Sequence, residues 1–179
     1  MKPPLFLDRD DTLIKNVPYL GDPAGVRLLP GVREHLPRLA ARFSLFIVSN
    51  QSGVGRGLIT PAQLDAVNAE MCRQLGGDPF TAIYMCYAAP GQPDPREERK
   101  PGIGMLRLAA TEYGVDPATG FFVGDRLGDM QCGLHAGCRC VLLLHETTDT
   151  PAQREQARGL AHYVAPDFAA AVEWILNEQ

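Results

Sequence analysis

The feature that most constrains the fold is a set of short, continuous apolar runs that end on polar residues. Leu5 to Asp8 reads LFLD, Ser44 to Ser49 reads SLFIVS, and Gly120 to Asp125 reads GFFVGD. Runs that are apolar at nearly every position are typical of parallel strands that are buried on both faces. We therefore expect these three segments to be strands of a parallel sheet.

Helical patterns separate the runs. Apolar residues recur at helical spacing from Pro30 to Phe43, although Pro37 lies inside that segment. Thr60 and Pro61 form a start signal for a helix that runs to Leu75. The alternation predicts an α/β fold: a three-layer, Rossmann-like parallel sheet with helices on both faces and no large cap domain. Further helices are expected over Gly102 to Tyr113, Leu127 to Ala136, Pro151 to Leu160 and Asp167 to Asn177, and further strands over Phe80 to Tyr87, Cys138 to Leu144 and Tyr163 to Ala165.

Length and composition fit one domain. The 179 residues include 17 Lys and Arg against 21 Asp and Glu, so no basic surface for nucleic acid or membrane lipid is expected. No apolar stretch approaches the roughly 18 residues of a membrane-spanning helix, and the first run is too short for a signal peptide. The five cysteines lack the spacing of a disulfide framework, which favours a reducing compartment. We expect a single cytoplasmic domain over residues 1–179, monomeric, with no nucleic-acid or membrane partner.

The first candidate site is Asp8-Arg9-Asp10-Asp11-Thr12, directly after the first strand. Two carboxylates two residues apart can act as nucleophile and proton donor when their environments differ. A calcium loop does not fit, because its sixth position would be Leu13 instead of Gly and its twelfth Tyr19 instead of Glu. On spacing alone, a solvated turn with aspartate caps explains the segment equally well.

Two further segments are candidate phosphate-binding sites, one at the end of a strand and one at the start of a helix. Ser49-Asn50-Gln51-Ser52-Gly53 supplies a hydroxyl and backbone N–H groups at the end of the second strand. Arg99-Lys100-Pro101 places two cations at the start of a helix, where an anion is favoured. Taken alone, the first is more simply a polar exit from a strand and the second a solvated charge run.

The fourth segment, Val123 to Asp129, places Asp125 and Asp129 on one side of a helical turn. Like charges held close require a cation, and oxygen ligands suit Mg²⁺, although capping of the helix explains the pair equally well. Parallel strands bring residues beyond their carboxyl ends to one edge of the sheet. Together, the four segments predict a magnesium-assisted phosphoryl-transfer site.

These four segments, in this order, resemble the motifs of haloacid dehalogenase superfamily phosphatases. The similar stretches are FLDRDDTL, VPY, LLPGV, VSNQSGVGRG, RKPGIGML and VGDRLGDMQ, which together span most of the chain. They are most similar to the branch that acts on heptose bisphosphates and histidinol phosphate. The resemblance implies Mg²⁺-dependent hydrolysis of a small phosphorylated sugar through an aspartyl-phosphate.

The resemblance also implies roles for the catalytic residues. Asp8 is expected to be the nucleophile, and Asp10 the group that protonates the leaving oxygen and then accepts a proton from water. Ser49 and Lys100 are expected to hold the transferring phosphoryl group, with Lys100 offsetting its charge.

Metal and substrate contacts are implied in the same way. Mg²⁺ is expected to bind the Asp8 carboxylate, the Asp10 backbone carbonyl and Asp125. Asp129 is expected to support these ligands without binding the metal. Arginines among the substrate contacts would fit a second phosphate. The expected substrate contacts are Asn16, Val17, Pro18, Tyr19, Ser49, Asn50, Gln51, Ser52, Arg99, Lys100 and Arg126.

Two positions depart from the family pattern. Asp11 stands where the first motif usually has Gly, and aspartate tolerates the left-handed backbone conformation that glycine allows. Relatives commonly carry a Cys-x-His…Cys-x-Cys zinc site after the third strand, whereas this chain has Cys86 and then no Cys or His as far as Lys100. One cysteine cannot form a four-ligand site, so we expect no zinc.

Two alternatives remain to a sugar-bisphosphate phosphatase. One is a phosphatase of histidinol phosphate, which shares the motifs. The other is a non-catalytic phosphate-binding module that keeps the fold. Every expected catalytic position is filled, which argues against the module.

Overall fold

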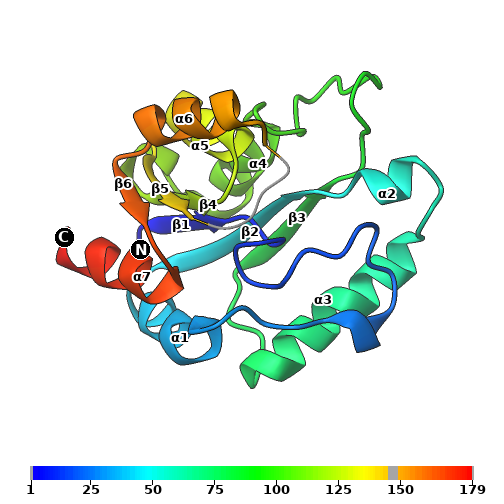
Figure 1. Cartoon of the computed structure of the whole chain (residues 1–179), viewed down its shortest axis with the longest axis horizontal. Coiled ribbons are helices and arrows are strands. Elements are labelled where there is room, and N and C mark those ends of the chain that lie inside the picture. Colours follow the sequence, from blue (N-terminus) through cyan, green and yellow to red (C-terminus); the bar gives the residue numbers. More distant parts are fainter. Residues whose placement is uncertain (1, 145–148, 179) are drawn as a thin grey trace.

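The computed structural model describes residues 2–144 and 149–178. Its named strands form one six-stranded sheet, in the order β3-β2-β1-β4-β5-β6, and every neighbouring pair is parallel (Figure 1). The predicted parallel α/β sheet is thereby confirmed. The strands are β1 (Pro4–Leu7), β2 (Ser44–Asn50), β3 (Ala82–Cys86), β4 (Phe121–Gly124), β5 (Arg139–Leu143) and β6 (Tyr163–Ala165).

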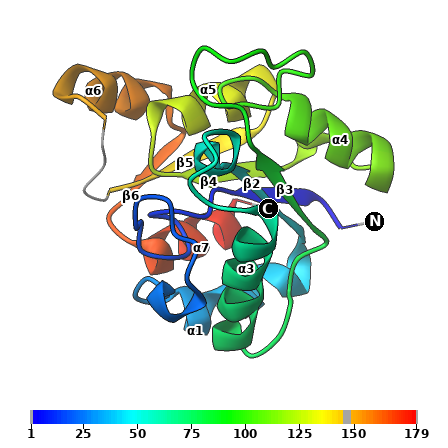
Figure 2. The ribbon, with the colours of Figure 1, turned by 90° about the vertical axis from the view of Figure 1, so that its right-hand side faces the viewer.

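Helices cover both faces of the sheet (Figure 2). Successive strand residues point to opposite faces, so Leu5 and Leu7 pack in one apolar layer and Phe6 in the other. The predicted three layers are confirmed. Among the described residues, none of the helices is long and apolar enough to cross a membrane. One face carries α1 (Val32–Arg42), α3 (Pro61–Leu75) and α7 (Phe168–Asn177), and the other carries α4 (Gly104–Tyr113), α5 (Leu127–His135) and α6 (Pro151–Leu160).

Local sequence explains how these helices begin and continue. At the start of α3, the Thr60 hydroxyl accepts a hydrogen bond from the Gln63 backbone N–H at 3.2 Å, and the Gln63 side chain accepts one from the Thr60 N–H at 2.9 Å. Pro37 lies inside α1 without interrupting it. Because Pro37 is on the exposed side, the carbonyl that it leaves unpaired one turn earlier can bond to water.

Two short elements differ from the expected ones. The third strand covers only Ala82–Cys86 rather than Phe80 to Tyr87, because β3 is an edge strand and pairs only with β2. Ser52–Gly55 forms a one-turn helix, α2, directly after β2, where no sequence pattern predicts a helix.

The centre of the sheet positions the site. β1 and β4 are neighbours, although the chain builds β2 and β3 between them. The first three strands therefore proceed toward one edge of the sheet and the last three toward the other, so the connections leaving β1 and β4 diverge. Such a reversal leaves a crevice beyond the carboxyl ends of the two strands. Asp8 follows β1 and Asp125 follows β4, so both carboxylates lie at this crevice.

Candidate active site

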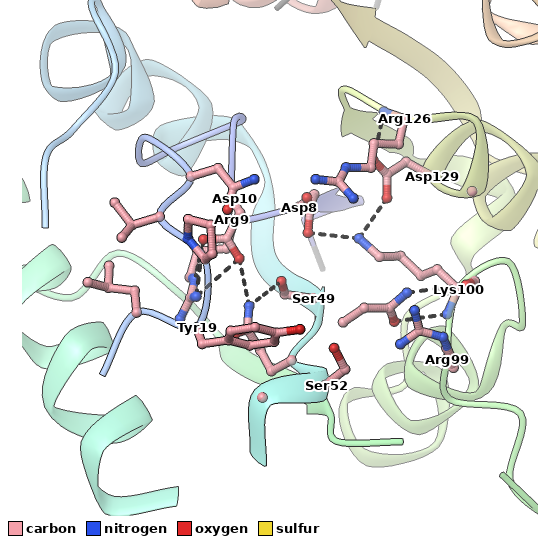
Figure 3. A pocket seen from close by; sticks show the side chains of 18 of the residues that line it. Asp8, Arg9, Asp10, Tyr19, Ser49, Ser52, Arg99, Lys100, Arg126 and Asp129 are labelled. Carbon is pink, nitrogen blue, oxygen red and sulfur yellow. Dashed lines mark hydrogen bonds and ion pairs between the residues drawn. The ribbon is translucent and has the colours of Figure 1, made fainter. Parts of the chain in front are cut away.

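A cavity of about 530 Å³ opens at the carboxyl ends of the central strands (Figure 3). Every expected site residue lines it except Asp125, which is buried, with 3% of its surface exposed. The structure therefore brings together residues from all four sequence segments. The expected residues that line the cavity are Asp8, Asp10, Asn16, Val17, Pro18, Tyr19, Ser49, Asn50, Gln51, Ser52, Arg99, Lys100 and Arg126.

Lys100 lies between two buried carboxylates. Its Nζ is 2.8 Å from Asp8 Oδ1 and 2.7 Å from Asp129 Oδ1, and its side chain is 4% exposed (Figure 3). Burial lowers the pKa of Lys100, but the negative charges of Asp129 and Asp8 outweigh that effect, so the pKa is raised above its ordinary value. The arrangement keeps an ammonium group in contact with the Asp8 carboxylate.

Asp125 is the one carboxylate of the site without a hydrogen-bond partner. Both of its side-chain oxygens are buried and unpaired, and the Arg126 Nε is 3.7 Å from Oδ2, too far for a hydrogen bond. Burial above all, and then the charges of Asp129 and Asp8, raise the pKa of Asp125 to about 9. A buried carboxylate in this situation requires a cation if it is to remain ionised.

The donor set suits a divalent cation that prefers oxygen. Asp8, Asp125 and Asp129 each offer one oxygen, and these three atoms lie within 4.8 Å of one another. The Oδ2 of Asp129 already accepts hydrogen bonds from the backbone N–H groups of Asp125 and Arg126, at 3.2 and 3.1 Å, while its Oδ1 contacts Lys100. The residues therefore fit Mg²⁺: Asp125 has no other hydrogen-bond partner, Asp8 offers an oxygen beside its contact with Lys100, and Asp129 fixes the turn.

Asp10 is held by neighbours on two sides. The Arg9 Nη2 donates to both of its carboxylate oxygens at 3.1 Å. From the other side, the Gln51 Nε2 donates to Asp10 Oδ2 at 2.7 Å and to the Ser49 hydroxyl at 3.0 Å. The hydroxyl of the second motif and the second carboxylate of the first motif thus share one amide donor.

Two expected substrate contacts are engaged with the protein itself. The Asn50 side chain bonds to the backbone of Lys100, and the Arg99 Nη1 donates to the Ala88 carbonyl at 2.8 Å. Both side chains therefore help to place the Arg99-Lys100 segment beside the cavity.

Sequence reasoning missed several residues of the lining. Arg9 lies between two predicted aspartates, but nothing in the sequence shows that its side chain is buried. Asp149 and Gln153 reach the cavity from the start of α6, and no motif marks them. Contacts of this kind depend on packing between distant segments.

Comparison with known proteins assigns the chain to a family. Residues 98–171 match the family described as HAD-hydrolase-like. The D-glycero-beta-D-manno-heptose-1,7-bisphosphate 7-phosphatase of Bordetella bronchiseptica is 35% identical over 179 residues, which cover 97% of this chain and 98% of the relative. The chain belongs to the haloacid dehalogenase-like phosphatases. The phosphatase of the same name from Yersinia pestis is 31% identical over 186 residues, covering 98% of this chain and 90% of the relative.

Solved structures agree with that assignment. The D,D-heptose 1,7-bisphosphate phosphatase of B. bronchiseptica, complexed with magnesium and phosphate, matches this phosphatase with a TM-score of 0.84 and 33% identity over the whole of both chains. The D,D-heptose 1,7-bisphosphate phosphatase of Burkholderia thailandensis matches with a TM-score of 0.67 and 25% identity, over 98% of this chain and 99% of that one. The chain is therefore a phosphoric monoester hydrolase, as its motifs predict.

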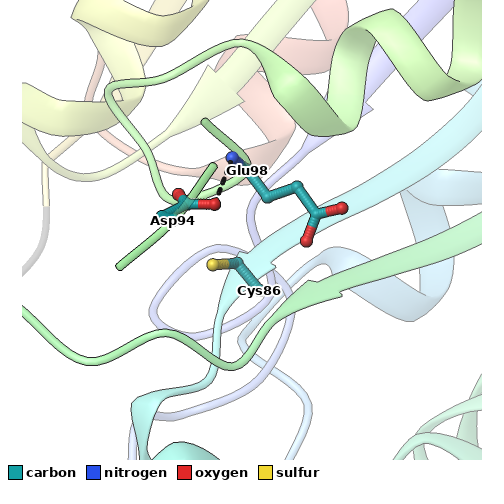
Figure 4. A group of neighbouring side chains, drawn as sticks. All are labelled: Cys86, Asp94 and Glu98. Carbon is teal, nitrogen blue, oxygen red and sulfur yellow. Dashed lines mark hydrogen bonds between the residues drawn. The ribbon is translucent and has the colours of Figure 1, made fainter. Parts of the chain in front are cut away.

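In this phosphatase, polar groups of the chain itself order the loop over residues 89–101. The Asp94 carboxylate accepts hydrogen bonds from the backbone N–H groups of Glu98 and Arg99, at 3.1 and 2.6 Å. Oxygens of Asp94 and Glu98 and the sulfur of Cys86 lie within 4.8 Å of one another (Figure 4). No spacing pattern in the sequence marks this group, because loop folding brings its members together. Both Asp94 oxygens already accept hydrogen bonds from the backbone, which makes them less available to a metal ion. That no zinc binds here stays a prediction.

Proposed function

We propose that this phosphatase removes the 7-phosphate of D-glycero-D-manno-heptose 1,7-bisphosphate, with Mg²⁺ as cofactor and an aspartyl-phosphate on Asp8 as intermediate. The observation that supports this substrate is the Bordetella relative named as a heptose-1,7-bisphosphate 7-phosphatase, which matches almost the full length of the chain. The reaction would supply a heptose 1-phosphate for lipopolysaccharide core synthesis. We take residues 1–179 to be one domain and the enzyme to be a cytoplasmic monomer that acts on a small phosphorylated sugar.

The first chemical step transfers the phosphoryl group to the protein. An oxygen of Asp8 forms a bond to phosphorus while the bond from phosphorus to the sugar oxygen breaks. Asp10 gives a proton to that sugar oxygen, so the sugar leaves as an alcohol. The Lys100 ammonium, 2.8 Å from Asp8 Oδ1, and the Ser49 hydroxyl are placed to stabilise charge on the phosphoryl oxygens.

The second step regenerates the enzyme. A water molecule bonds to the phosphorus of the aspartyl-phosphate and loses a proton to Asp10, while the bond from phosphorus to Asp8 breaks. Inorganic phosphate leaves, and the Asp8 carboxylate returns to its contact with Lys100. Asp10 ends the cycle protonated and ready for the next leaving group.

The unpaired Asp125 carboxylate supports the cofactor assignment. Mg²⁺ would be held by the carboxylates of Asp8 and Asp125 and by the backbone carbonyl of Asp10. When bound, it supplies positive charge that offsets these carboxylates and the phosphoryl oxygens. Asp129 keeps the turn after β4 in place through its bonds to two backbone N–H groups.

The lining of the cavity supports a doubly charged sugar. Arg99 and Arg126 line the cavity together with Lys100. A guanidinium group recognises phosphate through two parallel hydrogen bonds. We assign Arg99 and Arg126 to the second phosphate, and Asn16 to Tyr19 with Ser52 to the sugar.

The test is phosphate release from purified enzyme with Mg²⁺, comparing heptose 1,7-bisphosphate with histidinol phosphate. The expected result is a higher kcat/KM for the heptose, with ³¹P NMR showing loss of the 7-phosphate. A higher kcat/KM for histidinol phosphate would overturn the proposed substrate assignment. Wild type that is inert on both esters and on p-nitrophenyl phosphate would favour a phosphate-binding module. Asp8→Asn is the matched control and should be inactive on every ester.

A further inference from the structure

Asn68 is a polar residue on the buried side of α3, outside the cavity lining. It is 8% exposed, and the other buried residues of that helix, Leu64, Val67 and Met71, are apolar. A buried amide at such a position normally has a hydrogen-bond partner. Asn68 Oδ1 accepts a hydrogen bond from Arg9 Nη1 at 3.0 Å, across 59 residues of sequence.

Arg9 connects Asn68 to the acid–base carboxylate. Its side chain is 1% exposed. Its Nε donates to Asp10 Oδ1 at 3.3 Å, and its Nη2 donates to both oxygens of Asp10 at 3.1 Å. The guanidinium group is planar, and its donors have a fixed arrangement. Fixing Nη1 on Asn68 therefore fixes the plane in which the other two nitrogens meet the Asp10 carboxylate.

We infer that Asn68 is a positioning residue for Asp10 and acts through Arg9. The inference rests on the acid–base role of Asp10 in the proposed function. Without Asn68, Arg9 keeps a buried N–H without an acceptor and can turn toward another one. Asp10 then loses the orientation from which it delivers its proton, although it remains in the cavity.

A leaving-group comparison separates this role from a general structural one. A sugar alkoxide needs a proton as it leaves, whereas p-nitrophenolate leaves readily without one. A misplaced Asp10 therefore slows hydrolysis of the sugar ester more than that of the aryl ester. General loss of structure slows both alike. The relevant constant is kcat/KM, because it reports the step in which the alcohol leaves.

The experiment measures kcat/KM for heptose 1,7-bisphosphate and p-nitrophenyl phosphate in wild type, Asn68→Leu, Asn68→Asp and Val67→Ala. Asn68→Leu should lower the value for the sugar ester about tenfold more than that for the aryl ester, a part of what general acid catalysis supplies. Asn68→Asp keeps an acceptor at the same reach and should recover most of that difference. Val67→Ala, a core change in the same helix, should leave the ratio unchanged.

The remaining outcomes would overturn the positioning role of Asn68, the acid–base role of Asp10 or the proposed substrate. Equal losses on both esters in Asn68→Leu, or no recovery in Asn68→Asp, would overturn the positioning role. If Asn68→Leu does not fold, Asn68→Ser decides by the same ratio. Asp10→Asn serves as the reference: if it does not itself discriminate between the esters, the acid–base assignment has failed. If wild type does not hydrolyse the heptose ester, the proposed substrate has failed, and histidinol phosphate replaces it as the alkyl ester.

Discussion

The side-chain amide of Asn50 holds the backbone of Lys100 at both of its polar groups. Asn50 Nδ2 donates to the Lys100 carbonyl at 3.2 Å, and Asn50 Oδ1 accepts from the Lys100 N–H at 3.0 Å. Asn50 is the last residue of β2, whereas Lys100 lies near the end of a long loop. The sheet thereby fixes the position from which the ammonium group reaches Asp8.

Replacement of Asn50 by Ala should lower kcat about 100-fold, because a small displacement of a catalytic group has an effect of that size. The unfolding free energy should fall by about 1–3 kcal/mol, since a buried N–H and a carbonyl lose their partners. Asn50→Asp keeps the acceptor and should be less affected in both. Steady-state kinetics and urea unfolding provide the measurements. Unchanged kcat in Asn50→Ala would show that Lys100 is placed without this contact.

Lys100→Met should be destabilised as well as inactive. The substitution leaves Asp8 and Asp129 buried without their shared cation, and breaking a buried ion pair in this way costs about 3–5 kcal/mol. The double variant Lys100→Met/Asp129→Asn should regain part of that stability but none of the activity. Urea unfolding in the presence of a chelator isolates the effect. Wild-type stability in the single variant would contradict the prediction.

Addition of Mg²⁺ should stabilise the folded enzyme, and removal by a chelator should abolish activity. At 100 times the dissociation constant, a ligand of the native state adds about 2.7 kcal/mol. Asp125→Asn should remove most of the Mg²⁺-dependent rise in Tm, because it removes the unpaired carboxylate. Asp116→Asn changes an aspartate in the exposed cap of a short turn and should leave the rise unaffected. Thermal melts with and without Mg²⁺ give the comparison, and an undiminished rise in Asp125→Asn would place the metal elsewhere.

The residues that end strands could be predicted, and those that join distant segments could not. Asp8, Ser49 and Asp125 each follow a continuous apolar run, and the geometry of a parallel sheet brings such residues to one edge. The contact between Arg9 and Asn68 depends on how α3 packs against the sheet, which no local pattern specifies.

The helices, strands and loops differ in the same way: some follow from local sequence, and others depend on contacts between distant segments. Runs such as Ser44–Asn50 are long enough to identify an inner strand, and Thr60 with Pro61 marks a helix start from residue type alone. The extent of β3 depends on its pairing with β2, and the order of loop 89–101 depends on Asp94, which reaches forward to the backbone near Lys100. Those features appear only after the chain has folded.

The thiols should be nearly inert in the native enzyme. Burial raises the pKa of Cys72 to about 11 and those of Cys132 and Cys140 to about 12. At pH 8 only about one Cys72 thiol in 1,000 is then ionised, and the thiolate is the reactive form. Alkylation by iodoacetamide, followed by mass spectrometry, should therefore be slow in native protein, accelerate about tenfold from pH 8 to pH 9, and reach five sites in urea. Fast labelling of native Cys132 at pH 8 would contradict this.

Asp11 should contribute through its side chain as well as its backbone. It has a left-handed conformation, with φ of 55°, and its Oδ1 accepts a hydrogen bond from the Asn16 N–H at 2.9 Å. Asp11→Gly keeps the favourable backbone but releases the segment that lines the cavity from Asn16 to Tyr19, so KM should rise several-fold while stability changes little. Asp11→Ala should lose about 1–2 kcal/mol in addition, because alanine is strained at positive φ. Asp11→Asn retains both the acceptor and a tolerated backbone, so its KM and unfolding midpoint should stay close to wild type. If Asp11→Gly bound substrate as well as Asp11→Asn, the bond to Asn16 would have no part in shaping the cavity.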